Sequence, residues 1–361
     1  RLPMPENNRE IIKFTDLPQE YTCFKTSFEK DLGDVLDTGQ YIGGRYVDKF
    51  EEAISDTIFR KTGHKVYTVG VNSGTTALYL CLRFLRENVV PDSARHIPTT
   101  PTSFWATSEA ILAAGLIPSY EDIGERLQVP VLHDHTVVVS LHGHPVLGGY
   151  NAKYVIEDNA QCAPFHYNSE CWASTYSLFP SKPLGTCTDG GYICTQDEEL
   201  YDWLKRARYH GLDLSSDNRY VTTMSAGTMR LTEIPALYAW HKLQVLEDLQ
   251  DKRVSVAKMY CEKLDLPFYE DSYYHVMNIN VPDREEVVKT LLDSNVECNF
   301  HYPHTLEEQC IAAKSQYRAL GILINAENHA RTCLSLPLHP FMCEEDVDRI
   351  VGVVNDSCVS A

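Results

Sequence analysis

The sequence has no long apolar run, no excess of basic residues and no paired cysteine motif. No apolar stretch approaches the roughly 18 residues of a membrane span, so we expect no membrane association. Among the 361 residues, 32 are lysine or arginine and 50 are aspartate or glutamate, which gives a formal net charge of −18. Nucleic acids and anionic lipid surfaces are bound through clustered basic residues. We therefore expect neither of them as a partner.

The cysteines and histidines show no pattern of a disulfide framework or of a metal centre. Twelve cysteines are present, and most lie inside apolar runs, as Cys81 and Cys194 do, where a free thiol packs like a small hydrophobic side chain. Free thiols indicate a reducing compartment, so we expect a cytoplasmic protein. Histidine pairs such as His142 and His144 lack a third ligand at a fixed spacing, and we expect no metal site.

The remaining composition is that of an ordinary globular protein, with 43% hydrophobic and 23% charged residues. From residue 65 onward, short β-rich runs alternate with helical stretches. This alternation is typical of an α/β fold, in which helices wrap a mostly parallel sheet. The expected strands are 65–70, 96–100, 117–120, 136–141, 154–157, 174–178 and 192–195.

The pattern changes near residue 233, which indicates a second domain. One long helix is expected over 233–263, followed by strands and helices in alternation. We therefore predict a large domain over 10–232, with a mostly parallel central sheet, and a smaller C-terminal α+β domain over 233–361.

Two neighbouring segments carry the strongest candidates for chemistry. Asp158 is expected at the C-terminal end of a buried strand, where open α/β sheets place their ligand-binding groups. Lys182 follows the next strand and precedes a glycine-rich loop, where partial burial lowers the pKa of a lysine. Spacing alone favours the plainer alternative, a solvated loop lysine and a strand-end aspartate without a special role.

Two further features complete a recognisable set. Gly74 and Thr75 are expected where a strand turns into a helix, and the free amides of such a helix start bind phosphate, although an ordinary helix cap has the same sequence. Trp105 follows another strand and could stack on a flat ligand or pack in the core. Lysine, carboxylate, helix start and aromatic ring together match the needs of pyridoxal 5′-phosphate, which is bound covalently by the lysine while the carboxylate keeps the pyridine nitrogen protonated.

With these residues, the sequence resembles the DegT/StrS-type sugar aminotransferases, which are pyridoxal phosphate (PLP) enzymes of fold type I. The resemblance covers nearly the whole chain, and the order and spacing of its motifs carry it. Those motifs are Gly70-Val71-Asn72-Ser73-Gly74-Thr75, Thr100-Pro101 with Trp105, Ile156-Glu157-Asp158 with Ala160-Gln161, Ser177 through Gly185, Arg208-Tyr209-His210-Gly211 and Arg230-Leu231-Thr232-Glu233-Ile234.

The resemblance implies roles for individual residues around the cofactor. Lys182 resembles the lysine that binds the cofactor and moves the proton, and Asp158 resembles the partner of the pyridine nitrogen. Gln161 is similar in place to the residue near the ring hydroxyl, and Trp105 takes the stacking position. Three residues resemble the phosphate ligands: Gly74, Thr75 and Ser177.

Other positions concern the neighbouring subunit and the substrate. The family's usual asparagine, which reaches the phosphate of the neighbouring subunit, is replaced here by Thr228. Tyr302 and His304 resemble residues that approach the sugar, and a polar surface loop is the alternative. The segment between Gly143 and Asp158 is several residues shorter than usual, so we expect a surface helix to be lost or cut down.

The resemblance implies an aminotransferase that takes an amino group from a donor, usually glutamate, and passes it to a keto sugar, expected to be nucleotide-linked, in a ping-pong reaction. It also implies a homodimer with the active site at the subunit boundary. Three alternatives stay open: a transaminase of a non-nucleotide cyclic ketone, a sugar dehydratase on the same scaffold, and a non-catalytic binding protein. The dehydratases carry histidine in place of the lysine, so Lys182 argues against that alternative.

Overall fold

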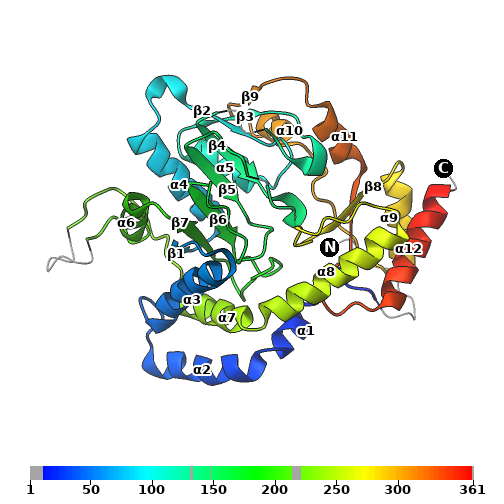
Figure 1. Cartoon of the computed structure of the whole chain (residues 1–361), viewed down its shortest axis with the longest axis horizontal. Coiled ribbons are helices and arrows are strands. Elements are labelled where there is room, and N and C mark those ends of the chain that lie inside the picture. Colours follow the sequence, from blue (N-terminus) through cyan, green and yellow to red (C-terminus); the bar gives the residue numbers. More distant parts are fainter. Residues whose placement is uncertain (1–10, 131–132, 147, 214–220, 360–361) are drawn as a thin grey trace.

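The computed structural model describes residues 11–130, 133–146, 148–213 and 221–359. At its centre is a five-stranded sheet (Figure 1), which consists of β1 (Tyr67–Val71), β7 (Gly191–Thr195), β6 (Ala173–Ser177), β5 (Tyr154–Asp158) and β4 (His135–Val139), in that order. The pairs β4/β5 and β5/β6 are parallel, and within this sheet β7 alone runs against its neighbours. The predicted mostly parallel sheet is confirmed.

Three more strands continue the parallel arrangement. β2 (His96–Thr99) pairs with β3 (Ile117–Tyr120), and β3 pairs with the short β9 (Arg318–Ala319), in parallel throughout. β2 lies beside β4, so this separate three-stranded sheet extends the central one. Most side chains of β2 and β3 are buried, as is usual for parallel strands covered on both faces, whereas the two residues of β9 are exposed.

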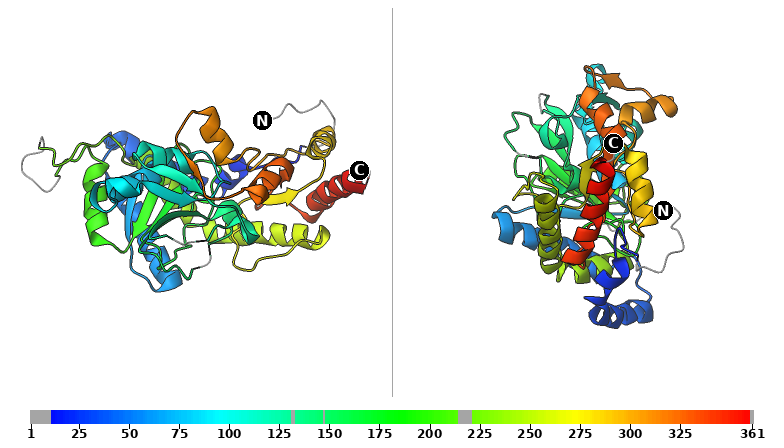
Figure 2. Two further views of the ribbon diagram at one scale, coloured as in Figure 1. Left: turned by 90° about the horizontal axis from the view of Figure 1, so that it is seen from above. Right: turned by 90° about the vertical axis from the view of Figure 1, so that its right-hand side faces the viewer.

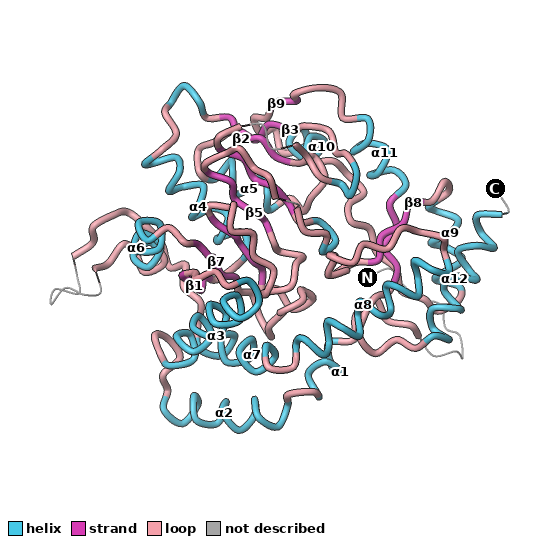
Figure 3. The backbone as a smooth tube through the Cα atoms, viewed as in Figure 1, coloured by secondary structure: helices cyan, strands magenta, loops and turns pink. Residues whose placement is uncertain are grey.

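Helices cover both faces of the sheet (Figures 1 and 3). On one face, α4 (Gly74–Asn88), α5 (Ala106–Ala113) and α6 (Glu198–Ala207) share a hydrophobic core with the strands. On the other face, α2 (Lys25–Thr38), α3 (Arg45–Thr62) and α7 (Glu233–Leu243) form a second core. Helical spacing brings Phe50 and Ile54 of α3 to one face, where the Phe50 ring meets the Tyr192 ring of β7 edge-on at 5.5 Å.

The single helix predicted over 233–263 is wrong, because the structure has two helices there. α7 ends at Leu243 and α8 (Leu246–Lys263) begins three residues later, after a turn in which Val245 leaves the helical conformation. The side chains of α7 pack in the second core of the large sheet, whereas Val256 and Tyr260 of α8 pack in a different core. One straight helix could not face both cores. We therefore propose that the large domain ends at this turn rather than at residue 232.

The small domain is built on its own core at the far end of α8 (Figure 2). It contains α9 (Arg284–Asp293), α12 (Glu344–Val359) and an antiparallel pair of strands, β8 (Met277–Asn280) and β10 (Cys333–Leu336). Ile12 joins this core through a bridge to Val296, so the chain at Ile12 packs with the small domain, whereas Phe24 and Phe28 pack in the second core of the large domain. α10 (Leu306–Ala312) and α11 (Ile324–Thr332) lie between the domains and pack around Tyr120 at the end of β3.

The connection from β4 to β5 is unusual for parallel neighbours. Such crossovers normally contain an α-helix. The described residues of this one contain a single 3₁₀ turn, η3 (Leu141–Gly143), and no α-helix. The short segment noted in the sequence therefore has no covering helix in the part that the structure describes. Two other 3₁₀ turns, η1 (Asp92–Ala94) and η2 (Glu125–Leu127), lie in loops of the large domain.

Across the described residues, no helix has both the length and the apolar content needed to cross a membrane. The described cysteines are all free thiols.

A buried ion-pair cluster ties the first described helix to the junction of the two domains. Glu20 of α1 (Leu17–Thr22) is 4% exposed and contacts Lys242 at 2.6 Å and Arg253 at 3.3 Å, so it joins α1 to both α7 and α8. Replacing one member of such a cluster leaves the others buried without a counter-charge.

We predict that Glu20→Gln lowers the free energy of unfolding by about 3–5 kcal/mol, because it leaves two buried cations unpaired. Urea unfolding followed by circular dichroism measures the change. Glu52→Gln, on an exposed position of α3, is the matched control and should change stability by less than about 0.5 kcal/mol. Equal losses in the two variants would contradict the role of the cluster.

Candidate active site

Most of the site residues expected from the sequence meet in one cavity of about 580 Å³ at the C-terminal ends of β5 and β6. Parallel strands bring their carboxyl ends to the same edge of a sheet, which is why segments far apart in sequence converge there. The expected residues that line the cavity are Gly74, Thr75, Asp158, Gln161, Ser177, Lys182 and Tyr302.

Asp158 is the buried carboxylate of this cavity, with 5% of its surface exposed. Its Oδ1 accepts a hydrogen bond from the amide of Ala160 at 3.1 Å, and its Oδ2 accepts one from the hydroxyl of Thr107 at 3.0 Å. Burial raises the pKa of Asp158 above its usual value, although the two hydrogen bonds and the nearby Lys182 oppose that rise. The carboxylate is thus oriented by two donors and suited to a cationic partner.

Lys182 lies in a tight loop that directly follows β6. Its amide donates to the carbonyl of Phe179 at 2.8 Å, and the amide of Gly185 donates to the carbonyl of Lys182 at 2.7 Å. Any Cβ at Gly185 would lie 2.1 Å from the carbonyl oxygen of Pro180, so this turn needs glycine. Burial lowers the pKa of Lys182 to about 8, against the opposing pull of Asp158. About a tenth of the amine is then neutral, and hence nucleophilic, at pH 7, far more than for an exposed lysine.

The start of α4 forms the anion-binding end of the cavity. Ser73 caps the helix by accepting the amide of Thr76 at 3.0 Å, while the amides of Gly74 and Thr75 have no acceptor within the helix. A Cβ at Gly74 would lie 2.8 Å from Cβ of Ser177, so only glycine allows this close approach. The first-turn amides and the Ser177 hydroxyl therefore come together where the helix dipole favours negative charge.

The expected stacking residue Trp105 does not line the cavity. Its ring packs with the cluster around Tyr120 and Ile123, on the other side of the loop. The preceding residue, Phe104, lines the cavity and is 61% exposed. Adjacent loop residues point in different directions, and no periodic pattern in the sequence tells which of two neighbouring aromatic residues faces the ligand.

Thr228 and His304 also lie outside the cavity lining. The Thr228 hydroxyl is 2.6 Å from Nε2 of His210 in an exposed loop of the same chain. The side chain of His304 is 71% exposed and lies 3.5 Å from Glu308 on α10. Neither residue touches the cavity formed by this chain.

The small domain contributes one wall of the cavity, through Asn299, Phe300, His301 and Tyr302. Gln161 bridges the two sides, because its Nε2 donates to the Tyr302 hydroxyl at 3.0 Å and its Oε1 accepts the amide of His142 at 2.5 Å. Burial, together with the charge of Lys182, lowers the pKa of His301 to about 4, so this ring is neutral at physiological pH. Sequence reasoning missed His301, Thr107 and Phe104, which reach the site from loops and from a helix without any motif of their own.

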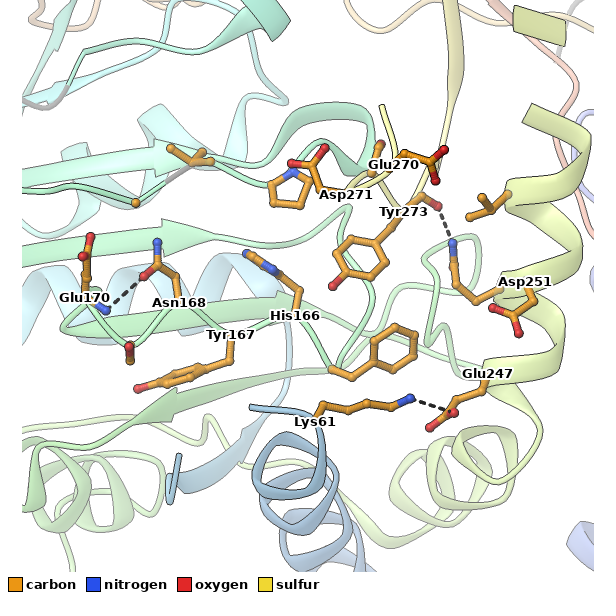
Figure 4. Close-up of a pocket in the computed structure, with 18 of the residues that line it drawn as sticks. Lys61, His166, Tyr167, Asn168, Glu170, Glu247, Asp251, Glu270, Asp271 and Tyr273 are labelled. Carbon is orange, nitrogen blue, oxygen red and sulfur yellow. Dashed lines mark hydrogen bonds and ion pairs between the residues drawn. The ribbon is translucent and has the colours of Figure 1, made fainter. Parts of the chain in front are cut away.

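A larger cleft of about 930 Å³ opens between the large domain and α8 (Figure 4). Its lysine, Lys61, is exposed and paired with Glu247 at 2.9 Å, and its other charged groups are mostly exposed carboxylates. Unlike the smaller cavity, this cleft does not have a buried carboxylate, a buried lysine and the start of a helix together in its lining. The smaller cavity around Lys182 is therefore the candidate active site. The described residues contain no group of histidine, cysteine, aspartate and glutamate side chains that could hold a metal ion.

The residues of the smaller cavity fit pyridoxal phosphate in their chemistry. An anion site at a helix start, a buried carboxylate and an amine of lowered pKa stand in one cavity with an aromatic ring at its edge. Glycine at position 74 lets the start of α4 lie against Ser177, because a Cβ there would clash with that residue.

A model of the DegT/DnrJ/EryC1/StrS aminotransferase family matches residues 22–133 and 151–355. The chain belongs to this family. The match omits 134–150, a range that holds β4 and most of the connection from β4 to β5. Membership confirms the family predicted from the sequence and the reaction class of an aminotransferase.

Individual relatives of this DegT/DnrJ/EryC1/StrS protein match it over most of both chains. The UDP-2-acetamido-2-deoxy-3-oxo-D-glucuronate aminotransferase of Pseudomonas aeruginosa is 30% identical, over 92% of this chain and 96% of the relative. The 3-oxo-glucose-6-phosphate:glutamate aminotransferase of Bacillus subtilis is 26% identical, over 96% of this chain and 84% of the relative. The crystal structure of a family member from Brucella abortus superposes with a TM-score of 0.85 at 24% identity, over 96% and 99% of the two chains. The predicted fold type I architecture is confirmed.

We predict that Gly74→Ala weakens the binding of pyridoxal phosphate at least about tenfold, a loss of 1.4 kcal/mol or more. The new methyl group would force the start of α4 away from Ser177 and separate the anion-binding donors. Fluorescence titration of the cofactor-free protein measures the dissociation constant. Gly33→Ala, in α2 with nothing near its Cβ position, is the control and should bind as the wild type does. Unchanged binding by Gly74→Ala would place the phosphate elsewhere.

Proposed function

We propose that this protein is a pyridoxal phosphate-dependent aminotransferase that moves an amino group from glutamate to a keto sugar, which is nucleotide-linked. One observation carries the proposal: Lys182, with its pKa lowered to about 8, shares a cavity with the buried Asp158 and the start of α4. Neither a solvated loop lysine nor a strand-end aspartate without a special role has these surroundings.

The cofactor would be held along the length of the cavity. The first amides of α4 (Gly74 and Thr75) and the Ser177 hydroxyl would bind its phosphate, and Asp158 would bind its ring nitrogen. Gln161 lies beside Tyr302 and would approach the ring hydroxyl. When bound, pyridoxal phosphate supplies an electron-withdrawing ring that draws charge from the carbon bearing the amino group.

The protein's own groups position the reactants and move the proton. Phe104, rather than Trp105, would cover the ring face. Lys182 would bind the cofactor through its neutral amine and, once released, move the proton at the reacting carbon from its Nζ. Asp158 would hold the proton on the ring nitrogen, because its carboxylate is fixed by Thr107 and Ala160.

The relatives support a keto sugar as acceptor and glutamate as donor. The Pseudomonas relative is named for a UDP-linked 3-oxo sugar, and the Bacillus relative for a sugar phosphate and for glutamate. Tyr302 and Asn299 line the cavity from the small domain and offer hydrogen bonds to sugar hydroxyls. His304 is exposed and does not line the cavity. A ketone without a nucleotide is the alternative acceptor. A dehydratase of this family would carry histidine at the position of Lys182, so Lys182 argues against that activity.

We also propose a cytoplasmic homodimer. Phe104 and Phe179 line the cavity with 61% and 50% of their surfaces exposed, as expected of side chains that a second subunit would cover. Thr228 lies outside the cavity of its own chain, which suits a contact with the phosphate bound by the partner. The free thiols agree with a reducing compartment.

We predict that Lys182→Ala lowers the transamination rate at least about 10³-fold, because it removes both the covalent attachment and the proton carrier. The assay supplies glutamate with a UDP-linked 3-keto hexose, or with the same sugar lacking the nucleotide, and measures 2-oxoglutarate and amino sugar. The exposed variant His304→Ala should stay within about twofold of the wild type. Release of ammonia with a deoxy sugar would instead favour the dehydratase, and no product from any keto sugar would favour a binding protein.

A further inference from the structure

A second buried carboxylate, Glu157, directly precedes Asp158 on β5. Successive side chains of a strand point to opposite faces, so Asp158 faces the cavity and Glu157 faces the other side of the sheet. Glu157 has no exposed surface, and the proposed mechanism does not use it. Burying a charge is costly unless the group is paired and hydrogen-bonded, so its surroundings must provide for it.

Donors from four segments satisfy both oxygens of Glu157. Oε1 accepts from Nε2 of His166 at 2.9 Å and from the hydroxyl of Ser140 at 3.1 Å. Oε2 accepts from the side-chain amide of Asn159 at 2.9 Å and from the hydroxyl of Ser174 at 3.4 Å. Among these donors, His166 is the one that can carry a positive charge.

The donors also determine the ionisation of Glu157. Burial alone would raise the pKa of Glu157, but the charge and hydrogen bond of His166, with the hydrogen bonds of Asn159 and Ser140, hold it below its usual value. Glu157 is then an anion at neutral pH. Glu157 directly precedes Asp158 in the chain, and its negative charge raises the pKa of Asp158.

His166 connects this buried pair to the surface. Its ring forms part of the inner wall of the large cleft (Figure 4), with 13% of the side chain exposed, and it packs against the ring of Tyr273 at 5.7 Å. The other charged groups that line the cleft come from neighbouring elements: Lys61, Glu170, Glu247, Asp251, Glu270 and Asp271. A chain of contacts therefore runs from the cleft through His166 and Glu157 to the back of Asp158.

We propose that Glu157 is a positioning residue for Asp158, that its negative charge acts on the active site from behind Asp158, and that His166 holds Glu157 in place. The proposal rests on the proposed function, because Asp158 matters only if it binds the cofactor's ring nitrogen. Glu157 anchors the end of β5 from the far face and adds negative potential behind Asp158. His166 fixes Oε1 of Glu157 by a hydrogen bond from the cleft side.

The test is the visible absorption of protein reconstituted with pyridoxal phosphate and titrated with pH. The midpoint reports the proton on the nitrogen that joins Lys182 to the cofactor, and negative potential favours that proton. Glu157→Gln should therefore lower the midpoint by about 0.5 pH unit, the order of magnitude expected for the loss of one partly screened charge. Glu157→Asp keeps the charge and should stay within about 0.2 pH unit of the wild type.

The two variants separate an electrostatic role from a structural one, because both alter the hydrogen bonds of Glu157, whereas Glu157→Gln alone removes its charge. Ser174→Ala removes a neutral donor from the same carboxylate and should leave the midpoint unchanged, and circular dichroism checks the fold of every variant. Equal shifts in Glu157→Gln and Glu157→Asp, or no shift in Glu157→Gln, would overturn the inference. If Glu157→Gln does not fold, Glu157→Asp decides alone, with an unchanged midpoint in support and a lowered one against. Wild-type protein without any visible band would contradict the proposed function itself.

Discussion

The candidate site depends on keeping a lysine and an aspartate out of water in one cavity. Burial favours the neutral lysine, whose pKa falls to about 8, and it raises the pKa of Asp158. Left unsupported, a buried carboxylate would take up a proton and lose its use as a partner for a ring nitrogen. Two hydrogen bonds on the cavity side and a second carboxylate behind it, with its own histidine, form the surroundings in which Asp158 can act.

The fold brings these groups together through the parallel strands. β5 delivers Asp158 and β6 delivers Ser177 to the same edge, and the loop after β6 brings Lys182 into the same cavity. Glycine at position 74 then lets α4 begin against Ser177. The small domain adds Tyr302 from the opposite side, so the cavity is closed by two domains that are joined by the break between α7 and α8.

Regular patterns in the sequence predicted the sheet well. The strand expected over 117–120 is β3 itself, and Asp158 stands at the strand end where the buried run 154–157 placed it. The helix expected over 233–263 was wrong, because apolar spacing does not show that the two halves pack in different cores. Trp105, expected to stack on the cofactor, lies outside the cavity lining while its neighbour Phe104 lines it, and loop residues follow no period that would distinguish the two. Contacts that join distant segments, such as those of Glu157 with His166 and Glu20 with Arg253, leave no local pattern to read.

Reductive trapping of the cofactor tests the central claim most directly. Cofactor-free protein is mixed with pyridoxal phosphate at a series of pH values and reduced with borohydride, and the modified peptide is identified by mass spectrometry. Neutral amine is the attacking species, so the adduct should map to Lys182 and reach half its maximal initial rate near the pKa of about 8, rather than near the 10.4 typical of exposed lysines. An adduct on other lysines, or one that forms only as the pH approaches 10, would contradict the account.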